Sequence, residues 1–180
     1  MKSFVSMLVC LSTTQHVTNI ERSMPLSAEY ESFVNDRDSL GTVVIAFGHY
    51  VKWDKAPSAV FTSFLLAFSK LKRYRFVWQC GVNFAKKFQI PKHILIREWL
   101  PQTALLNHPK TVLFISHVGL KSFIEALCAR VPIVTLPLFA EQHVNAMIVN
   151  NRGIGVDLDR YSLSAQKVES AVIDSADPIN

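Results

Sequence analysis

The chain has 180 residues, which at roughly 150 residues per domain is enough for one domain and little more. Its composition, 49% hydrophobic and 18% charged residues, is that of a globular protein and excludes a chain that is disordered throughout. The 19 Lys and Arg exceed the 14 Asp and Glu, and the net charge of +5 favours anionic partners without indicating nucleic acid. The longest apolar runs, residues 4–11 and 60–68, are shorter than the about 18 residues that span a bilayer, so no transmembrane helix is expected.

The first residues differ in pattern from the rest of the chain. Lys2, the apolar residues 4–11 and the small polar residues 12–14 have the minimal outline of a signal peptide. Residues 15–22 show neither a helical nor a strand period. We therefore interpret residues 1–23 as a leader or a poorly ordered segment, residues 24–174 as the folded domain and residues 175–180 as a tail.

From residue 42 onward, short β-branched runs alternate with longer runs of helical period, which predicts parallel strands joined by crossover helices. The expected strands are residues 42–47, 76–78, 93–96, 112–115, 133–136 and 156–158. The expected helices are residues 58–71, 102–106, 119–129 and 142–150, the last ended by Gly153, and a final helix capped by Ser164, whereas residues 81–91 are expected to form a loop. The predicted fold is α/β, doubly wound, with a mostly parallel, Rossmann-like sheet that binds ligands at the carboxyl ends of its strands.

Several common signatures are absent. Nothing matches the phosphate-loop pattern G-x-x-x-x-G-K-[ST], and residues 153–155 supply only two glycines of the dinucleotide motif. G-x-S-x-G and H-E-x-x-H do not occur, and the three cysteines are not at metal-ligand or redox spacing. Phosphate-loop, nicotinamide, serine-hydrolase and zincin functions are therefore not indicated, and no metal site is expected.

The end of the fourth predicted strand favours anion binding. His117 follows this strand, and Gly119 is expected to turn the backbone tightly into a helix whose first N–H groups have no internal acceptor. These groups and the helix dipole would hold an anion such as a diphosphate, to which Ser122 could add a hydroxyl. Glu125 lies on the same helical face as Ser122 and suits the vicinal hydroxyls of a ribose. The alternative is that Glu125 is solvated.

Two further motifs follow neighbouring strands. Trp99, in the sequence Trp-Leu-Pro-Gln, comes directly after the third strand, so its indole is expected on an edge loop where it can stack on a base. The alternative for Trp99 is a core or rim aromatic. Glu141 and Gln142 come just after the fifth strand, and a carboxylate beside an amide suits the hydroxyls of a sugar.

Together these motifs resemble the signature of the UDP-glycosyltransferase family, most closely its animal UDP-glucuronosyltransferases, including nematode members. The family's signature box has W-x-P-Q at its start, H-x-G-x-x-S-x-x-E-A in its middle and an acid–Gln pair at its end. The 44 residues from Trp99 to Gln142 match that box in length and order. Looser similarity extends from Met24 to Leu158, which is 135 of the 180 residues.

The resemblance implies the carboxyl-terminal, donor-binding half of a GT-B glycosyltransferase, with a UDP-sugar as donor substrate and neither a cofactor nor a metal. The residues expected at the donor site are Trp99 for uracil, Gln102 and Glu125 for ribose, His117, Gly119, Lys121 and Ser122 for the diphosphate, and Glu141 and Gln142 for the transferred sugar.

The sequence departs from the family pattern at four positions. Val118 replaces the second residue of H-G-G or H-C-G and is expected to crowd the phosphate turn. Lys121 replaces an Asn, Glu141 an Asp, and His49 the Ser of F-G-S. Each change leaves donor binding feasible but affects how the sugar would be aligned.

In this family a His oriented by an Asp, both in an amino-terminal domain, deprotonates the small lipophilic acceptor, whose oxygen displaces UDP with inversion. Neither His16 nor His49 has an Asp in a suitable place, so no catalytic residue is predicted and the chain is expected to be inactive alone. Two alternatives remain. One is a pseudoenzyme that binds UDP-sugar or pairs with full-length relatives, and the other is a subunit that docks on a partner carrying the base. The resemblance implies the endoplasmic reticulum, or the cytoplasm if residues 4–11 are not a signal.

Overall fold

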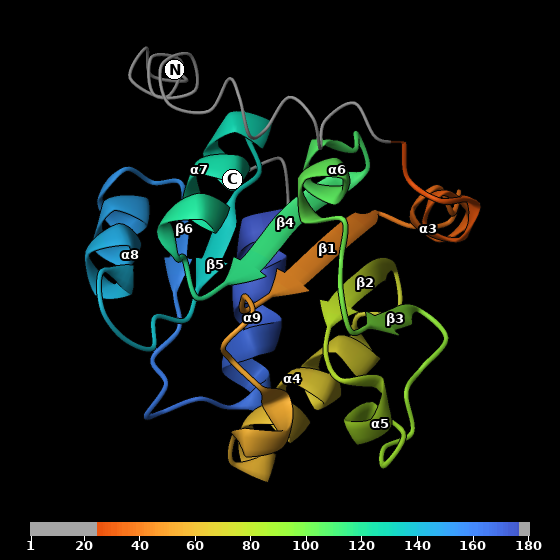
Figure 1. Cartoon of the computed structure of the whole chain (residues 1–180), viewed down its shortest axis with the longest axis horizontal. Helices are drawn as coiled ribbons and strands as arrows, with labels where there is room; N and C mark the ends of the chain where they lie inside the picture. The colour runs from red at the N-terminus through yellow and green to blue at the C-terminus, as the bar shows by residue number, and fades with distance from the viewer. Residues whose placement is uncertain (1–24, 177–180) are drawn as a thin grey trace.

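The computed structural model describes residues 25–176, in which six parallel strands form one sheet with helices on both faces (Figure 1). The strands are β1 (Gly41–Ala46), β2 (Tyr74–Gln79), β3 (Ile94–Arg97), β4 (Thr111–Ser116), β5 (Ile133–Thr135) and β6 (Gly155–Asp157). Their order is β3-β2-β1-β4-β5-β6, and all five neighbouring pairs are parallel. This is the order of a doubly wound dinucleotide-binding sheet, and the predicted fold class is confirmed.

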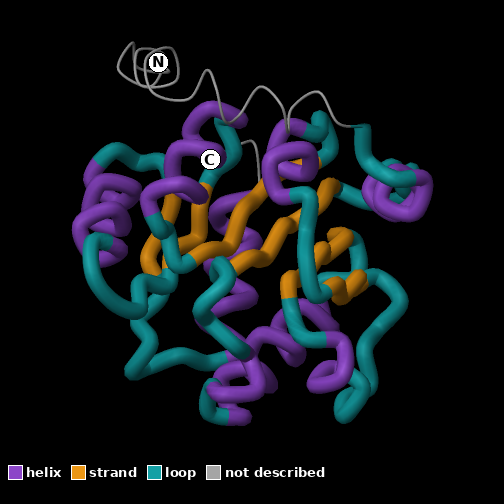
Figure 2. The backbone as a smooth tube through the Cα atoms, in the orientation of Figure 1, coloured by secondary structure: helices purple, strands orange, loops and turns teal. Residues whose placement is uncertain are grey.

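Helices flank the sheet in two layers, as Figure 2 shows. The helices are α3 (Ala28–Val34), α4 (Ser58–Lys70), α5 (Val82–Ala85), α6 (Gln102–Asn107), α7 (Leu120–Ala129), α8 (Gln142–Asn151) and α9 (Ala165–Ala176), with a 3-10 turn, η1, at Trp53–Lys55. Side chains of α4, α5 and α9 share one buried cluster, and those of α3, α6, α7 and α8 share another. No helix within residues 25–176 is long and apolar enough to cross a bilayer.

The apolar character of β1 follows from this layering. All six residues of β1 are buried. Val43 and Ile45 belong to the cluster beneath α4 and α9, whereas Val44 and Ala46 belong to the cluster beneath α6 and α7. Because successive side chains of a strand point to opposite faces, a strand covered on both faces is apolar throughout rather than alternating.

Aromatic rings fix the loop that follows β1. Phe61 of α4 stacks on Trp78 of β2 with centroids 4.7 Å apart, and Trp53 meets the same indole edge-on at 4.9 Å. Trp53 also donates its Nε1–H to the carbonyl of Gln79 at 3.0 Å and contacts Phe47 edge-on at 5.2 Å. The backbone that leaves β1 is therefore held by packing close to the carboxyl edge of the sheet.

The predicted strands and long helices are confirmed, with small shifts at their ends. The backbone of Lys167 donates to Ser164 Oγ at 3.3 Å, as expected of an N-cap, and Gly153 has the left-handed φ of 62° expected after α8. Three short elements were not predicted: α3, η1, and α5 within the expected loop. The predicted leader lies outside the described residues, and α9 continues through Ala176, two residues beyond the predicted end of the domain.

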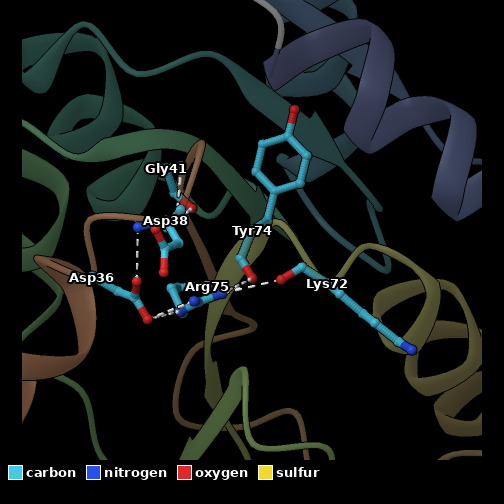
Figure 3. A network of polar contacts seen from close by, with 7 residues as sticks. Asp36, Asp38, Gly41, Lys72, Tyr74 and Arg75 are labelled. Carbon is cyan, nitrogen blue, oxygen red and sulfur yellow. Dashed lines mark hydrogen bonds and ion pairs between the residues drawn. The ribbon is translucent and has the colours of Figure 1, made fainter.

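An ion pair ties the loop after α3 to the amino end of β2 (Figure 3). Arg75 donates from Nε and Nη2 to Asp36 Oδ2 at 3.0 and 2.5 Å, and from Nη1 to the carbonyls of Lys72 and Tyr74. The backbone N–H of Asp38 donates to the other oxygen of Asp36 at 3.0 Å. Hydrogen bonds from Arg75 and from Asp38 lower the pKa of Asp36.

Asp36 should therefore contribute to acid stability. A carboxyl whose pKa is lower in the folded than in the unfolded chain stabilises the fold above the unfolded pKa of about 3.9, and this contribution is lost as the pH falls through the folded pKa. We expect Asp36→Asn to be less stable near neutral pH and to show a shallower loss of stability below pH about 4. Urea unfolding across pH measures this effect. Asp38→Asn is the control, because Asp38 joins the network through its backbone, and equal acid profiles for the Asp36→Asn variant and the unmodified chain would contradict the assignment.

Candidate functional site

A cavity of about 790 Å³ opens at the carboxyl ends of β1 and β4, where the strand order reverses. Ligands bind at this point in doubly wound sheets because the loops that leave the two strands diverge there. The walls come from the loop after β1, residues 99–104, the first turns of α7 and the start of α3. The cavity brings together seven of the nine predicted site residues: Trp99, Gln102, His117, Gly119, Lys121, Ser122 and Glu125.

The turn from β4 into α7 differs from the prediction. Gly119 has an ordinary φ of −55°, and the left-handed residue is Val118, with φ 55°. The N–H of Val118 donates to Ser116 Oγ at 3.1 Å, and its carbonyl accepts from Asn145 Nδ2 at 2.9 Å. Ser116 and Asn145, which the sequence pattern did not single out, therefore hold the turn that directs the first N–H groups of α7 at the cavity.

The expected crowding by Val118 is wrong. Its side chain is fully buried and belongs to the same cluster as Ala46 and Phe123, so it does not line the cavity. The left-handed backbone costs a β-branched residue about 1–2 kcal/mol. Burial of the isopropyl group, which stabilises a fold by about 1.5–3 kcal/mol, offsets that cost.

His117 lies between two glycines. A Cβ on Gly48 would come within 3.0 Å of the imidazole Cε1, and a Cβ on Gly119 within 2.8 Å of Nε2. Burial lowers the pKa of His117, with a smaller opposing effect of Glu141, so the ring is neutral at pH 7. Within the described residues the buried Nδ1 of His117 makes no hydrogen bond. The backbone of Ala46 lies near the ring and raises its pKa slightly, which only partly offsets the effect of burial. In the free protein His117 therefore presents a neutral imidazole to the cavity.

Glu125 is buried, with 4% of its surface exposed, so the alternative of a solvated carboxylate is wrong. Gln102 Nε2 donates to its Oε2 at 2.5 Å, and Thr103 Oγ1 donates to its Oε1 at 2.9 Å. Lys121 Nζ lies 3.7 Å from Oε1. Gln102 Nε2 also lies 3.1 Å from Ser122 Oγ, so the polar groups of α6 and α7 form one connected cluster on the cavity wall.

Trp99 presents its indole to the cavity on an edge loop, as predicted, with 69% of its surface exposed. Its carbonyl accepts from Tyr30 Oη at 3.3 Å, and its ring meets His49 at a centroid distance of 6.4 Å. An ion pair between Glu29 and Arg97 joins α3 to the end of β3 as well. The unpredicted helix α3 thus braces the segment that carries Trp99.

Glu141 and Gln142 do not line the cavity. Gln142 is buried, and its Oε1 accepts the N–H groups of Leu138 and Phe139 at 2.9 and 3.1 Å. Glu141 is exposed at the N-cap of α8, close enough to His117 to affect the pKa of that ring. The amide of Gln142 therefore fixes the loop before α8, and contact of either residue with a sugar stays a prediction.

No group of three or more His, Cys, Asp or Glu side chains gathers in a metal-binding arrangement in the part of the chain that the structure describes.

The fold and the position of the cavity place the chain among the Rossmann-like domains of GT-B glycosyltransferases. Os79 of rice, solved in complex with UDP, is 25% identical with a TM-score of 0.68 over 80% of this chain and 34% of its own. The glycotransferase of kitacinnamycin is 22% identical with a TM-score of 0.70 over 79% of this chain and 36% of its own.

The sequence model described as UDP-glucoronosyl and UDP-glucosyl transferase matches residues 9–176, and the chain belongs to this family of UDP-glycosyltransferases. The nematode protein ugt-60 of Caenorhabditis elegans, named as a UDP-glucuronosyltransferase, is 34% identical over 145 residues, or 79% of this chain. UDP-glucuronosyltransferase 1A7 of mouse is 32% identical over 154 residues, or 86% of this chain. The chain spans 28% of the length of each of these relatives.

The packing of His117 against Gly119 can be tested without a ligand. In Gly119→Ala the new methyl group should displace the imidazole from its half-buried position, so the pKa of His117 should rise toward its ordinary value of 6.5. Titration of the His117 ring by NMR measures the change.

Gly81→Ala is a matched control, because Gly81 also caps a helix, has a φ of −58°, and would place its Cβ within 4 Å of no other group. Both variants replace an N-cap glycine by alanine and should lose similar stability for that reason. If His117 titrates identically in the two variants, the contact between Gly119 and His117 is not what holds the ring.

Proposed function

We propose that this chain binds the UDP part of a UDP-sugar and is the donor-binding portion of a glycosyltransferase. In this proposal the complete protein transfers a hexosyl group, such as glucuronosyl, with inversion to a small lipophilic acceptor. The observation that carries the proposal is the buried carboxylate of Glu125, held by Gln102 and Thr103 on the wall of a cavity that the first turn of α7 also faces.

The ribose would be recognised by Glu125 and Gln102. A buried carboxylate is costly unless it accepts hydrogen bonds, and each of its oxygens can accept two. Gln102 and Thr103 occupy part of that capacity, so the vicinal hydroxyls of a ribose can donate to the rest. Buried groups that are held in place in this way discriminate well, because a ligand lacking the hydroxyls would leave them unsatisfied.

The other parts of UDP would meet groups of matching chemistry. The exposed face of Trp99 offers a stacking surface for uracil. At the amino end of α7, the backbone N–H groups, the Ser122 hydroxyl and the neutral His117 can donate to a diphosphate. The same groups would stabilise UDP as a leaving group, because negative charge grows on the diphosphate as the bond to the sugar breaks.

The binding site can be tested by calorimetry with UDP. Trp99→Ala removes the stacking surface and Glu125→Gln removes the charged acceptor, so each should weaken UDP by about 1 kcal/mol or more, roughly fivefold. Trp99→Phe keeps an aromatic face and should retain part of the affinity. Thermal unfolding of each variant identifies any loss of folded protein. Unchanged UDP affinity in both Trp99→Ala and Glu125→Gln would exclude this cavity as the nucleotide site.

The 180-residue chain alone should bind the donor without transferring its sugar. His49 and His117 line the cavity, but neither ring is hydrogen-bonded to a carboxylate within residues 25–176. Without an oriented base within about 3 Å of the acceptor hydroxyl, the transfer rate falls typically by 10² to 10⁴. Slow hydrolysis of the UDP-sugar remains feasible because the groups proposed to stabilise UDP as a leaving group belong to this chain.

The measurement is incubation of the purified chain with UDP-glucuronate and a panel of phenols, with conjugates and free UDP followed by mass spectrometry. A chain heated to unfold it is the background control. Conjugates formed at rates normal for an enzyme, with no other protein present, would show that these 180 residues contain a base.

A further inference from the structure

We propose that a second cavity, beside the first, binds a planar aromatic molecule that carries one negative charge, such as an aromatic carboxylate. This cavity measures about 610 Å³ and opens at the carboxyl ends of β1 and β2. Its volume is within the range of about 300–1,000 Å³ that is typical of small-molecule sites. None of the groups proposed to bind ribose or diphosphate lines it, so the inference goes beyond the proposed function.

The second cavity adjoins the first without including the polar cluster of α6 and α7. Most of its walls come from η1 with the loop before it, and from α5 with the residues on either side, and these residues do not line the first cavity. The residues that line both cavities are Gly48, His49, Gln79 and Trp99. A molecule in the second cavity therefore lies next to the proposed nucleotide site and not in it.

Aromatic side chains that are already held by their own packing form much of the wall. Trp53 is buried, donates its Nε1–H to the carbonyl of Gln79 at 3.0 Å, and meets Phe47 edge-on at 5.2 Å. Phe84 of α5 is half-buried and meets Phe61 edge-on at 4.9 Å. A ring that enters the cavity can pack against these side chains without first ordering them, which favours a rigid aromatic ligand.

The charged groups around the cavity favour a single negative charge on the ligand. Lys52 and Lys87 line the wall, and among the described residues neither ammonium forms an ion pair. Asp54 and Glu98 line the wall as well, and Asp54 lies 3.9 Å from the ammonium of Lys55, which does not line it. Three ammonium groups therefore stand against two carboxylates, which leaves an excess of one positive charge.

Lys87 places positive charge beside the aromatic wall. Its Nζ lies 5.8 Å from the centroid of the Phe84 ring, within the range of a cation–π contact, and its side chain is exposed. An acidic group on a ring that packs near Phe84 can therefore reach this ammonium. Because hydrogen bonds between charged groups are stronger than those between neutral ones, a carboxylate is favoured over an amide of the same shape.

The experiment is an NMR titration of the whole isotope-labelled chain with cinnamate, a planar aromatic carboxylate, and with the uncharged cinnamamide. Cinnamate should shift the indole N–H of Trp53, which lines only the second cavity, and should leave the side-chain amide of Gln102, which lines only the first, in place. Cinnamate should bind about threefold more tightly than cinnamamide, and added salt should reduce this difference.

Lys87→Gln is the test variant and Lys86→Gln is its matched control, because Lys86 is the adjacent exposed lysine and does not line the cavity. Lys87→Gln should weaken cinnamate binding about threefold and leave cinnamamide binding unchanged. The double variant with Lys52→Gln and Lys87→Gln should weaken cinnamate binding about tenfold. Lys86→Gln should bind both compounds as the unmodified chain does.

Four results would overturn the inference: equal affinities for cinnamate and cinnamamide, equal losses in Lys87→Gln and Lys86→Gln, a shift of Gln102 without one of Trp53, or no shift of Trp53 up to the solubility limit of cinnamate. The NMR spectrum of each variant shows whether it is folded. UDP is titrated separately on the same samples. A chain that binds cinnamate but not UDP contradicts the proposed function and leaves this inference standing, so the two can fail independently.

Discussion

The left-handed turn at Val118 is the constraint on which the candidate site depends. Val118 turns the chain between β4 and α7. Its N–H donates to Ser116 Oγ, and its carbonyl accepts from the Asn145 side chain of α8. With the turn fixed, the first N–H groups of α7, the ring of His117 and the carboxylate of Glu125 all face one cavity. The strain of a β-branched residue in this conformation is tolerated because the same side chain fills the core beneath the turn.

The features of the fold that could be predicted are those that depend on the residues of a single segment. Strands covered on both faces are apolar throughout, and polar residues just beyond them fall at one edge of the sheet, which is why His117 was identified as a site residue. Glu125 was identified because it lies three residues after Ser122, on the same face of the following helix. The pairing of Gln102 with Glu125 could not be predicted in the same way, because it depends on the packing of α6 against α7 across 23 residues of sequence. Helix α3 was missed because it has seven residues and buries only Tyr30 and Val34, too few to show a period.

Two of the four departures from the family pattern act in physically different ways. Val118 changes the core under the turn and leaves the cavity wall alone, whereas Lys121 changes the charge of the wall itself. Gln142 shows that a residue of the signature box can stabilise its own loop. Its Oε1 accepts hydrogen bonds from the backbone N–H groups of Leu138 and Phe139. A matching motif therefore indicates where the functional residues lie, and the contacts of each residue are needed to see what it does there.

The half-buried imidazole of His117 gives the cavity a group that can take up a proton. Desolvation lowers the pKa of this ring, and an anion bound beside it would offset the desolvation and raise that pKa. Occupation by a polyanion and uptake of a proton are then thermodynamically coupled, with each favouring the other. The heat of binding would accordingly vary with the ionisation enthalpy of the buffer, and acidification toward the raised pKa would favour the occupied cavity over the empty one. A half-buried side chain packed between two glycines would thus link the acidity of the surroundings to the retention of a charged ligand.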